Sequence, residues 1–244
     1  MRRLLAAAAL LLAAPGGAGA EEARIAVATN FGEPAEALAA DFNAATGDSI
    51  LISQGSTGAL YLQIRSGAPF AALLAADQAR PERLAAEGLA VPESRFTYAR
   101  GRLALFSRDY GVSVGPDLLR AGDIARIAIA DPDVAPYGVA AMATLRSLGV
   151  EDAVRSRIVF GKNVAQAYQF VWSGSAEVGF VALAQVVNHL GGARWVVPES
   201  MHPPIDQDAI LIDPELKAAR AFLDYLKQPA AQDTIRSFGY GIVE

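Results

Sequence analysis

The sequence predicts an α/β protein of two lobes, each a mostly parallel sheet flanked by helices. Several segments with strong strand propensity, such as 25–28 and 127–130, are apolar at every position, as expected for strands covered on both faces. The segments between the strands repeat apolar residues at helical spacing. Strands that alternate with helices are typical of a parallel sheet, because each parallel pair needs a crossover connection.

The predicted strands follow one another along most of the chain. They occupy residues 24–28, 49–53, 71–75, 103–107, 126–130, 157–160, 178–183, 195–197 and 207–212. Helices are predicted between them where apolar residues recur three or four positions apart. These residues are Leu38 with Phe42, Leu60 with Ile64, Val139 with Met142 and Leu145, and Val164 with Tyr168 and Val171.

The order of the elements predicts where the chain passes between the lobes. Residues 21–99 form one strand–helix series and residues 100–204 a second. A Pro-rich, polar stretch at 201–208 is expected to cross back, so that residues 205–244 rejoin the first lobe with helices at 214–227 and 230–238. Two lobes joined by two connections make a hinge.

Residues 1–20 are predicted to be a cleaved signal peptide. Arg2 and Arg3 precede an apolar run of eleven residues at 4–14, and Ala18-Gly19-Ala20 has the small-x-small pattern of a cleavage site. The run is too short to span a bilayer, and no Cys follows it for lipid attachment. We therefore expect export to the periplasm, no membrane insertion, and a mature chain that begins at Glu21.

Composition excludes several classes of protein. With no Cys in the chain there is no disulfide and no thiolate chemistry. Loss of Arg2 and Arg3 with the signal peptide would take the net charge from −5 to −7, which argues against a nucleic-acid partner. An acidic protein that binds an anion must therefore use local dipoles rather than bulk attraction.

Polar or glycine-rich turns follow four of the predicted strands. They are Thr29-Asn30-Phe31-Gly32, Gly55-Ser56-Thr57-Gly58, Pro136-Tyr137-Gly138 and Gly161-Lys162-Asn163-Val164. Turns at the carboxyl ends of parallel strands share one edge of a sheet, where ligands bind. Each following helix would point its free amides and its positive dipole end toward that edge, which predicts an anion site without Lys or Arg.

Each turn also has an ordinary structural interpretation, which the sequence leaves open. Ser56 and Thr57 are favoured N-cap residues, and Thr29 or Asn30 would cap the next helix equally well. In the structural interpretation, Tyr137 is an aromatic residue in a loop without a ligand role. Val164 can contribute only its backbone amide to a ligand. The shared location of the four turns favours the binding interpretation.

No catalytic constellation is evident. His189 and His202 are far apart and belong to no metal-binding motif, and the nucleophile-elbow, P-loop and dinucleotide-binding patterns are absent. Acidic residues that could be imagined as a metal cluster fall on separate elements. These are Asp77, Asp131, Asp133, Asp206 and Asp208. A secreted hydrolase or a regulatory domain is thus less well supported than a binding protein.

The motifs taken together resemble those of the periplasmic molybdate-binding proteins of molybdate ABC transporters, over nearly the whole mature chain. They are Val27-Ala28-Thr29-Asn30-Phe31, Gly55-Ser56-Thr57-Gly58 with Leu60-Tyr61-Leu62-Gln63-Ile64, Ser66-Gly67-Ala68-Pro69-Phe70 with Ala76-Asp77, Ala130-Asp131-Pro132 with Ala135-Pro136-Tyr137-Gly138, Gly161-Lys162-Asn163-Val164, Gly179-Phe180-Val181-Ala182-Leu183 and Pro204-Ile205-Asp206-Gln207-Asp208-Ala209.

The resemblance implies a type II periplasmic-binding-protein fold with an oxyanion, molybdate or tungstate, in the cleft between the lobes. It implies a monomer without a cofactor that delivers its ligand to the membrane permease. Oxygen atoms of the anion would be bound from both lobes by Thr29, Asn30, Ser56, Thr57, Tyr137 and Val164.

The chain departs from the family pattern at two places. Some members have a tyrosine where Ala182 stands, so one hydroxyl donor is missing and Tyr137 is the expected replacement. Many have an acidic residue at the position of Ala71-Ala72, a change expected to affect lobe packing.

The absence of a carboxylate at the tips of the four turns bears on the choice of anion. Phosphate keeps a proton at neutral pH, and a dry site must satisfy that proton with an acceptor. A site made of donors alone favours a fully deprotonated dianion. Sulfate meets this condition as well, so another oxyanion such as sulfate, or another small solute, remains the alternative ligand.

Overall fold

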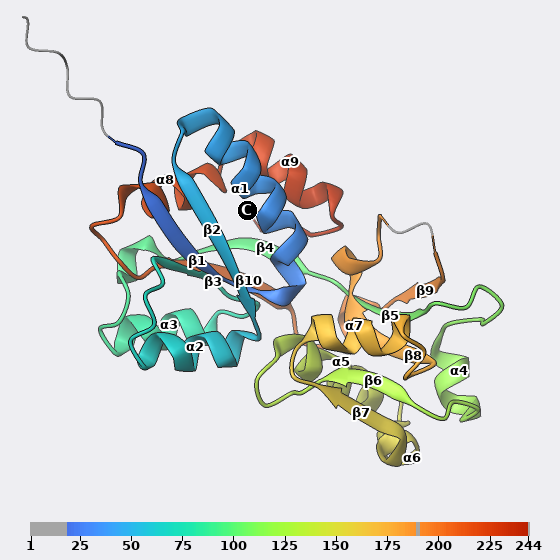
Figure 1. The fold of residues 1–244 in the computed structure, drawn as a ribbon. Coiled ribbons are helices and arrows are strands. Elements are labelled where there is room, and N and C mark those ends of the chain that lie inside the picture. Colours follow the sequence, from blue (N-terminus) through green and yellow to red (C-terminus); the bar gives the residue numbers. More distant parts are fainter. Residues whose placement is uncertain (1–18, 189–190, 244) are drawn as a thin grey trace, which may run out of the picture.

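The computed structural model describes residues 19–188 and 191–243, and it contains two lobes, each with a five-stranded sheet (Figure 1). Residues 1–18 of the predicted signal peptide lie outside the described part of the chain. Among the described residues, no helix is both long enough and apolar enough to cross a bilayer.

The first sheet has the strand order β2-β1-β3-β10-β4. Its strands are β1 (Glu22–Ala28), β2 (Ser49–Gly55), β3 (Ala72–Leu74), β4 (Phe96–Gly101) and β10 (Ile205–Leu211). Strand β1 runs parallel to both β2 and β3, whereas β10 is antiparallel to β3 and β4. The sheet is thus mixed, with β10 as its one reversed strand.

The second sheet repeats this plan with the order β7-β6-β8-β5-β9. Its strands are β5 (Leu103–Ser107), β6 (Ile127–Ala130), β7 (Ile158–Gly161), β8 (Val178–Ala182) and β9 (Ala193–Val196). Strand β6 is parallel to β7 and β8, and β5 is antiparallel to β8 and β9. The predicted α/β class with mostly parallel sheets is confirmed.

Helices cover both faces of each sheet. In the first lobe these are α1 (Gly32–Thr46), α8 (Lys217–Tyr225) and α9 (Pro229–Ser237) on one face and α2 (Thr57–Arg65) and α3 (Ala79–Ala86) on the other. In the second they are α4 (Pro116–Ala121), α5 (Pro136–Ser147), α6 (Glu151–Val154) and α7 (Val164–Trp172). Short 3₁₀ turns lie at Thr29–Phe31, Pro92–Ser94, Arg155–Arg157, Leu183–Gln185 and Glu199–Met201.

Local sequence accounts for several helix ends. Helix α1 ends at Gly47, whose φ of 82° lies in the left-handed region that glycine adopts without strain. Helices α5 and α9 begin with Pro136 and Pro229, because a proline at the first helical position loses no hydrogen bond. Burial on both sides explains why strands such as β6 are apolar throughout.

Strand β4 was missed by the sequence analysis, and the polar stretch predicted at 201–208 is half strand, because β10 begins at Ile205. Both errors have one physical cause, which is charge neutralisation between the two strands. Arg100 Nε lies 2.6 Å from Asp206 Oδ1, and Arg95 Nη1 lies 3.0 Å from Asp208 Oδ2. In the sequence, these charged segments resemble loops. In the structure, their opposite charges pair between neighbouring antiparallel strands.

The chain passes between the sheets twice. Strand β4 ends at Gly101 and β5 begins at Leu103, so Arg102 alone separates a strand of one sheet from a strand of the other. The return runs through Pro203 and Pro204 into β10. The C-terminal segment is held beside the first crossing, since Gly241 bridges Arg100.

Candidate functional site

A pocket between the lobes brings the four predicted turns together. Its volume, counted with its open mouth, is about 190 Å³. The residues that line it are Ala28, Thr29, Asn30, Gly55, Ser56, Thr57, Ala76, Ala135, Pro136, Tyr137, Asn163 and Val164. All six predicted site residues are among them, at the boundary between the lobes.

The Ser-Thr turn caps helix α2 and still leaves its hydroxyl protons available. Ser56 Oγ accepts a hydrogen bond from the Ala59 amide at 3.4 Å, and Thr57 Oγ1 accepts one from the Ala76 amide at 3.0 Å. The capping interpretation of Ser56 is therefore correct. Because each oxygen acts as an acceptor in these contacts, its own proton remains free for a further acceptor.

Three helices start at the pocket. Helix α2 begins at Thr57, α5 at Pro136 and α7 at Val164, where Asn163 Oδ1 caps the helix by accepting from the Gln166 amide at 2.9 Å. Amides of a first helical turn have no partner inside the helix, and the dipole adds a partial positive charge there. The N-termini of helices from both lobes thus line the pocket.

Asn30 lines the pocket, and its side chain also belongs to a buried hydrogen-bond network. Its Nδ2 atom donates to Gln207 Oε1 at 2.8 Å and to Tyr240 Oη at 3.2 Å, which uses both amide protons. The Tyr240 hydroxyl in turn donates to the Asn30 carbonyl at 2.6 Å. Both N–H groups of the Asn30 side chain are thus used inside the protein in this structure, and its contact with a ligand stays a prediction.

Tyr137 belongs to the same buried network. Gln207 Nε2 donates to Tyr137 Oη at 3.4 Å, and Tyr98 Oη lies 2.9 Å from Gln207 Oε1. Sequence analysis missed Gln207, Tyr98 and Tyr240 as site residues. The single available signal was a glutamine at a strand position inside the Pro204-to-Ala209 motif.

Burial sets the protonation of these phenols. It raises the pKa of Tyr137 above the ordinary value, while hydrogen bonding with Gln207 opposes the rise in part. Burial likewise raises the pKa of Tyr98 and of Tyr240 well above the ordinary range. The hydroxyls are thus neutral donors at physiological pH, and all the pocket-lining residues within the described chain are uncharged.

The lobes touch across the pocket. The Gly58 amide at the start of α2 donates to the Val134 carbonyl of the second lobe at 2.9 Å. Arg80 Nη2 lies 3.3 Å from the Asp133 carbonyl. A Cβ at residue 58 would lie 3.0 Å from Val134 Cα and its carbonyl oxygen, so glycine allows this close approach.

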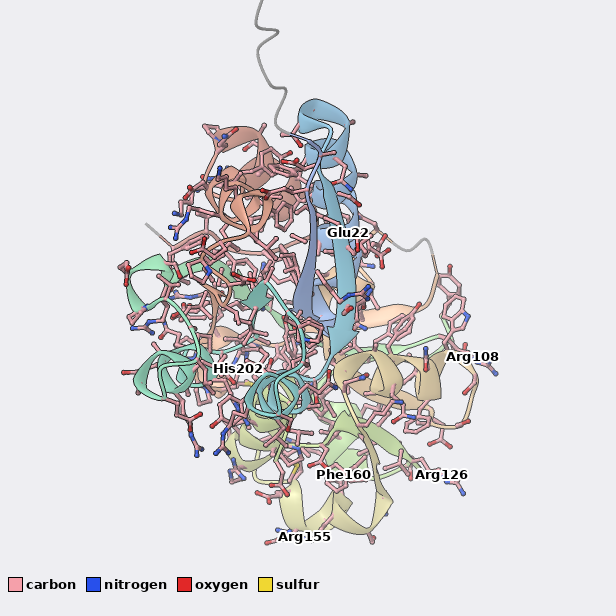
Figure 2. All side chains as sticks on the ribbon, turned by 60° about the vertical axis from the view of Figure 1, so that its left-hand side comes forward. Glu22, Arg108, Arg126, Arg155, Phe160 and His202 are labelled. Carbon is pink, nitrogen blue, oxygen red and sulfur yellow. The ribbon has the colours of Figure 1, made fainter. Side chains whose placement is uncertain are left out.

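The residues set aside as enzyme candidates have structural roles. Asp77 Oδ1 and Asp131 Oδ1 each accept from a backbone amide two or three residues on, at 3.0 Å, as turn-forming residues do. In the described part of the chain no group of three or more His, Asp or Glu side chains is arranged to hold a metal. His202 is buried near the junction of the lobes (Figure 2), with Nδ1 2.8 Å from the Pro203 carbonyl. His189 lies outside the described residues.

The two departures from the resemblance fall in the core. Ala182 is fully buried at the end of β8, where its amide donates to Gln185 Oε1 at 3.0 Å, and it lies outside the set of pocket-lining residues. Ala71 and Ala72 pack in the main core of the first lobe. Both lie outside the set of pocket-lining residues, and an effect of this second change on lobe packing stays a prediction.

Comparison with known proteins places the chain among binding proteins. The family model of the bacterial extracellular solute-binding proteins matches residues 23–241. The molybdate-binding protein ModA of Rhodobacter capsulatus is 44% identical over 225 residues, covering 91% of this chain and 89% of the relative. ModA of Azotobacter vinelandii is also 44% identical, over 91% of each chain.

A solved structure agrees with these relatives. The periplasmic molybdate-binding protein of Azotobacter vinelandii superposes with a TM-score of 0.88 and 37% identity, over 91% of this chain and 100% of that one. The family model and the two relatives each cover nearly the whole chain. The chain therefore belongs to the bacterial extracellular solute-binding proteins and, within them, to the ModA family.

Proposed function

We propose that this protein captures molybdate, and tungstate as a second ligand, in the periplasm and delivers it to the permease of an ABC transporter. The observation that carries the proposal is the pocket of convergent N–H and O–H donors between the lobes, lined by uncharged residues within the described chain. Its relatives are named for molybdate binding. The predicted signal peptide, residues 1–20, supports a periplasmic location, and we propose that the protein works as a monomer.

We assign the oxyanion contacts to both lobes. Thr29, with the backbone of Asn30, and the Ser56 and Thr57 hydroxyls would bind from the first lobe. Tyr137 and the Val164 amide would bind from the second, with the Tyr137 hydroxyl replacing the tyrosine that some relatives have at position 182.

The absence of a carboxylate from the residues that line the pocket favours binding of a fully deprotonated anion. The proton of hydrogenphosphate would find no carboxylate there, and a neutral hydroxyl or carbonyl oxygen accepts a hydrogen bond less strongly than a charged acceptor does. Sulfate carries no such proton and remains the alternative ligand. The larger size of molybdate and tungstate is then the property by which the pocket would select them.

Ligand energy would close the hinge. We propose that residues 21–99 with 205–244 move as one body and residues 100–204 as the other. Hydrogen bonds to a charged ligand contribute roughly 1.5–3 kcal/mol each. About five of them sum to roughly 7.5–15 kcal/mol, and the upper part of this range exceeds the roughly 8 kcal/mol of micromolar binding, which leaves free energy to offset the ordering and closure of the lobes.

Calorimetric titration with molybdate, tungstate, sulfate and phosphate tests the proposal. We expect micromolar or tighter binding of molybdate and tungstate, and no measurable heat with phosphate. Thr57→Ala should weaken molybdate binding by at least about tenfold, because it removes a hydroxyl that faces the pocket and holds the Ala76 amide. If sulfate gives heat of binding and molybdate gives none, the protein is a sulfate-binding protein and the molybdate proposal is wrong.

A further inference from the structure

We propose that Arg80 is a positioning residue for oxyanion capture, which ties the loop at residues 131–135 of the second lobe to the first lobe and so slows release of the ligand. The inference rests on the proposed oxyanion-binding function and deepens it, because it concerns how the lobes are held together around the anion. Arg80 does not itself line the pocket, so it acts through the loop that it contacts.

Arg80 reaches from one lobe to the other across a cavity. This cavity shares Ala76 and Pro136 with the pocket, and its volume, counted with its open mouth, is about 510 Å³. Helix α3 of the first lobe and helix α5 of the second lobe both line it. Because the cavity separates these two helices, a long side chain is needed for contact, and Arg80 Nη2 donates to the Asp133 carbonyl at 3.3 Å.

Asp77 holds the Arg80 guanidinium in the position from which it reaches the second lobe. Arg80 Nη1 lies 2.5 Å from Asp77 Oδ2, and the Arg80 amide donates to Asp77 Oδ1 at 3.0 Å. The Asp77 carbonyl accepts from the Asp208 amide of β10 at 3.4 Å, which anchors Asp77 to the first sheet. The planar guanidinium offers donors in several fixed directions, so one nitrogen binds the carboxylate while another contacts Asp133.

The ion pair between Arg80 and Asp77 is mostly covered by protein. The side chain of Arg80 is 26% exposed and that of Asp77 is 18% exposed. Salt and water screen a partly buried pair less than a surface pair. The carboxylate therefore restricts the guanidinium more than an exposed partner would, which reduces the entropy lost when Arg80 binds the second lobe.

The loop that Arg80 contacts is continuous with a wall of the pocket. Asp131 Oδ1 accepts from the Asp133 amide at 3.0 Å, and the Asp131 amide donates to the Gly161 carbonyl at 2.7 Å. The Ala135 amide closes the turn on the Asp131 carbonyl at 2.9 Å. Ala135 and the following Pro136 line the pocket. A contact that holds the Asp133 carbonyl thus holds this wall of the pocket against the first lobe.

The position of the contact predicts an effect on release rather than on capture. Arg80 and Asp133 belong to different bodies of the proposed hinge, so opening of the lobes separates them. The contact forms only after the lobes have approached each other, and it therefore leaves the encounter with the anion unchanged. Its loss should raise the dissociation rate and the Kd by the same factor, with the association rate unaltered.

Arg80→Ala tests this effect. We expect radiolabelled molybdate to leave the variant about fivefold faster than the wild type in an excess of unlabelled molybdate, as for one lost hydrogen bond, and the calorimetric Kd to rise equally. Arg83→Ala removes the same charge from an exposed position on α3 and should release molybdate at the wild-type rate. A folded Arg80→Ala protein with wild-type release overturns the inference.

Asp77→Asn separates the contact between the lobes from the charge of Arg80. The asparagine keeps an oxygen for the Arg80 amide but loses the charged oxygen that directs the guanidinium. If Arg80 acted only as a positive charge near the anion, removal of the neighbouring negative charge would tighten molybdate binding. The proposed contact predicts the opposite, which is faster release and a higher Kd.

The outcomes distinguish this inference from the proposed function. Tighter molybdate binding by a folded Asp77→Asn protein contradicts the role of Arg80, while the assignment of the oxyanion pocket stands. A wild-type protein that binds no oxyanion removes both. A cooperative urea transition shows for each variant that it is folded.

Discussion

At the scale of single residues, the structural and functional interpretations of a motif proved compatible. Ser56 caps α2 through its oxygen lone pair and keeps a proton for the pocket. Asn30 departs from this pattern because both protons of its amide are used inside the protein. Whether a polar residue can serve a ligand thus depends on which of its donors remain after local hydrogen bonding.

Ser56→Ala should therefore lower both stability and affinity. Loss of the cap costs about 1 kcal/mol of unfolding free energy, and loss of the donor raises the molybdate Kd about tenfold. Urea unfolding and calorimetry measure the two effects. Ser66→Ala, at the other end of the same helix where Ser66 Oγ is exposed and bonded to the Leu62 carbonyl, should leave Kd unchanged. An unchanged Kd in Ser56→Ala removes Ser56 from the binding set.

The buried tyrosines predict the alkaline limit of stability. Folding raises the pKa of Tyr98 and Tyr240 above the ordinary value of 10.0, so the folded state holds more protons than the unfolded state at high pH. Stability is then fully present below about pH 10 and falls as the pH rises further. Urea unfolding across this range should show the decline, and Tyr98→Phe should reduce its slope. A flat profile would contradict the assignment of neutral buried phenols.

At the scale of elements, the start of α2 contacts the second lobe through Gly58 and Val134. Gly58→Ala places a methyl group against Val134 and should disfavour the closed form. We expect a molybdate Kd several times higher, caused by faster dissociation, which stopped-flow kinetics measures. Leu62→Ala, an exposed change on the same helix, is the control. Equal dissociation rates in Gly58→Ala and the wild type would show that this contact does not govern closure.

Pairing of β4 with β10 depends on charges that face each other. Asp208 is buried and is held by Arg95 and by the Thr97 hydroxyl. Arg95→Ala should cost roughly 2 kcal/mol of unfolding free energy, less than the 3–5 kcal/mol of a fully buried pair because Arg95 is partly exposed. Arg120→Ala breaks an exposed pair with Asp117 and should cost less than about 1 kcal/mol. Equal urea midpoints for the two variants would contradict this account.

At the scale of the whole molecule, an acidic protein of a binding-protein family holds an uncharged pocket between its lobes. Its relatives are solute-binding proteins, so the prediction that the chain is not an enzyme is confirmed. The formal net charge of −5 repels a dianion at long range. Under the proposed function, attraction would come from the helix ends and hydroxyls that line the cleft, which act at short range.

This separation of long-range and short-range charge effects predicts an unusual response to salt. Screening by sodium chloride should raise the association rate of molybdate, because it weakens bulk repulsion more than the contacts inside the pocket. Stopped-flow tryptophan fluorescence at increasing ionic strength measures this rate. A rate that falls with salt would indicate a cationic entrance that the proposed pocket does not have.

The sequence by itself determined the local features of this protein. Apolar strands, helical periodicity and the composition of four turns predicted the α/β class and six of the twelve residues that line the pocket, because each depends on neighbours within a few positions. The ends of the C-terminal helices were less well predicted, with α8 beginning at Lys217 rather than at 214.

Only the tertiary structure decided what depends on distant partners. Strand β4 was hidden because its charges are neutralised by β10, more than a hundred positions away along the chain. Gln207, Tyr98 and Tyr240 reach the site through contacts between residues 70 to 210 positions apart. Hydrogen-bond direction in such a network follows from which acceptors folding brings together, and local sequence does not contain that information.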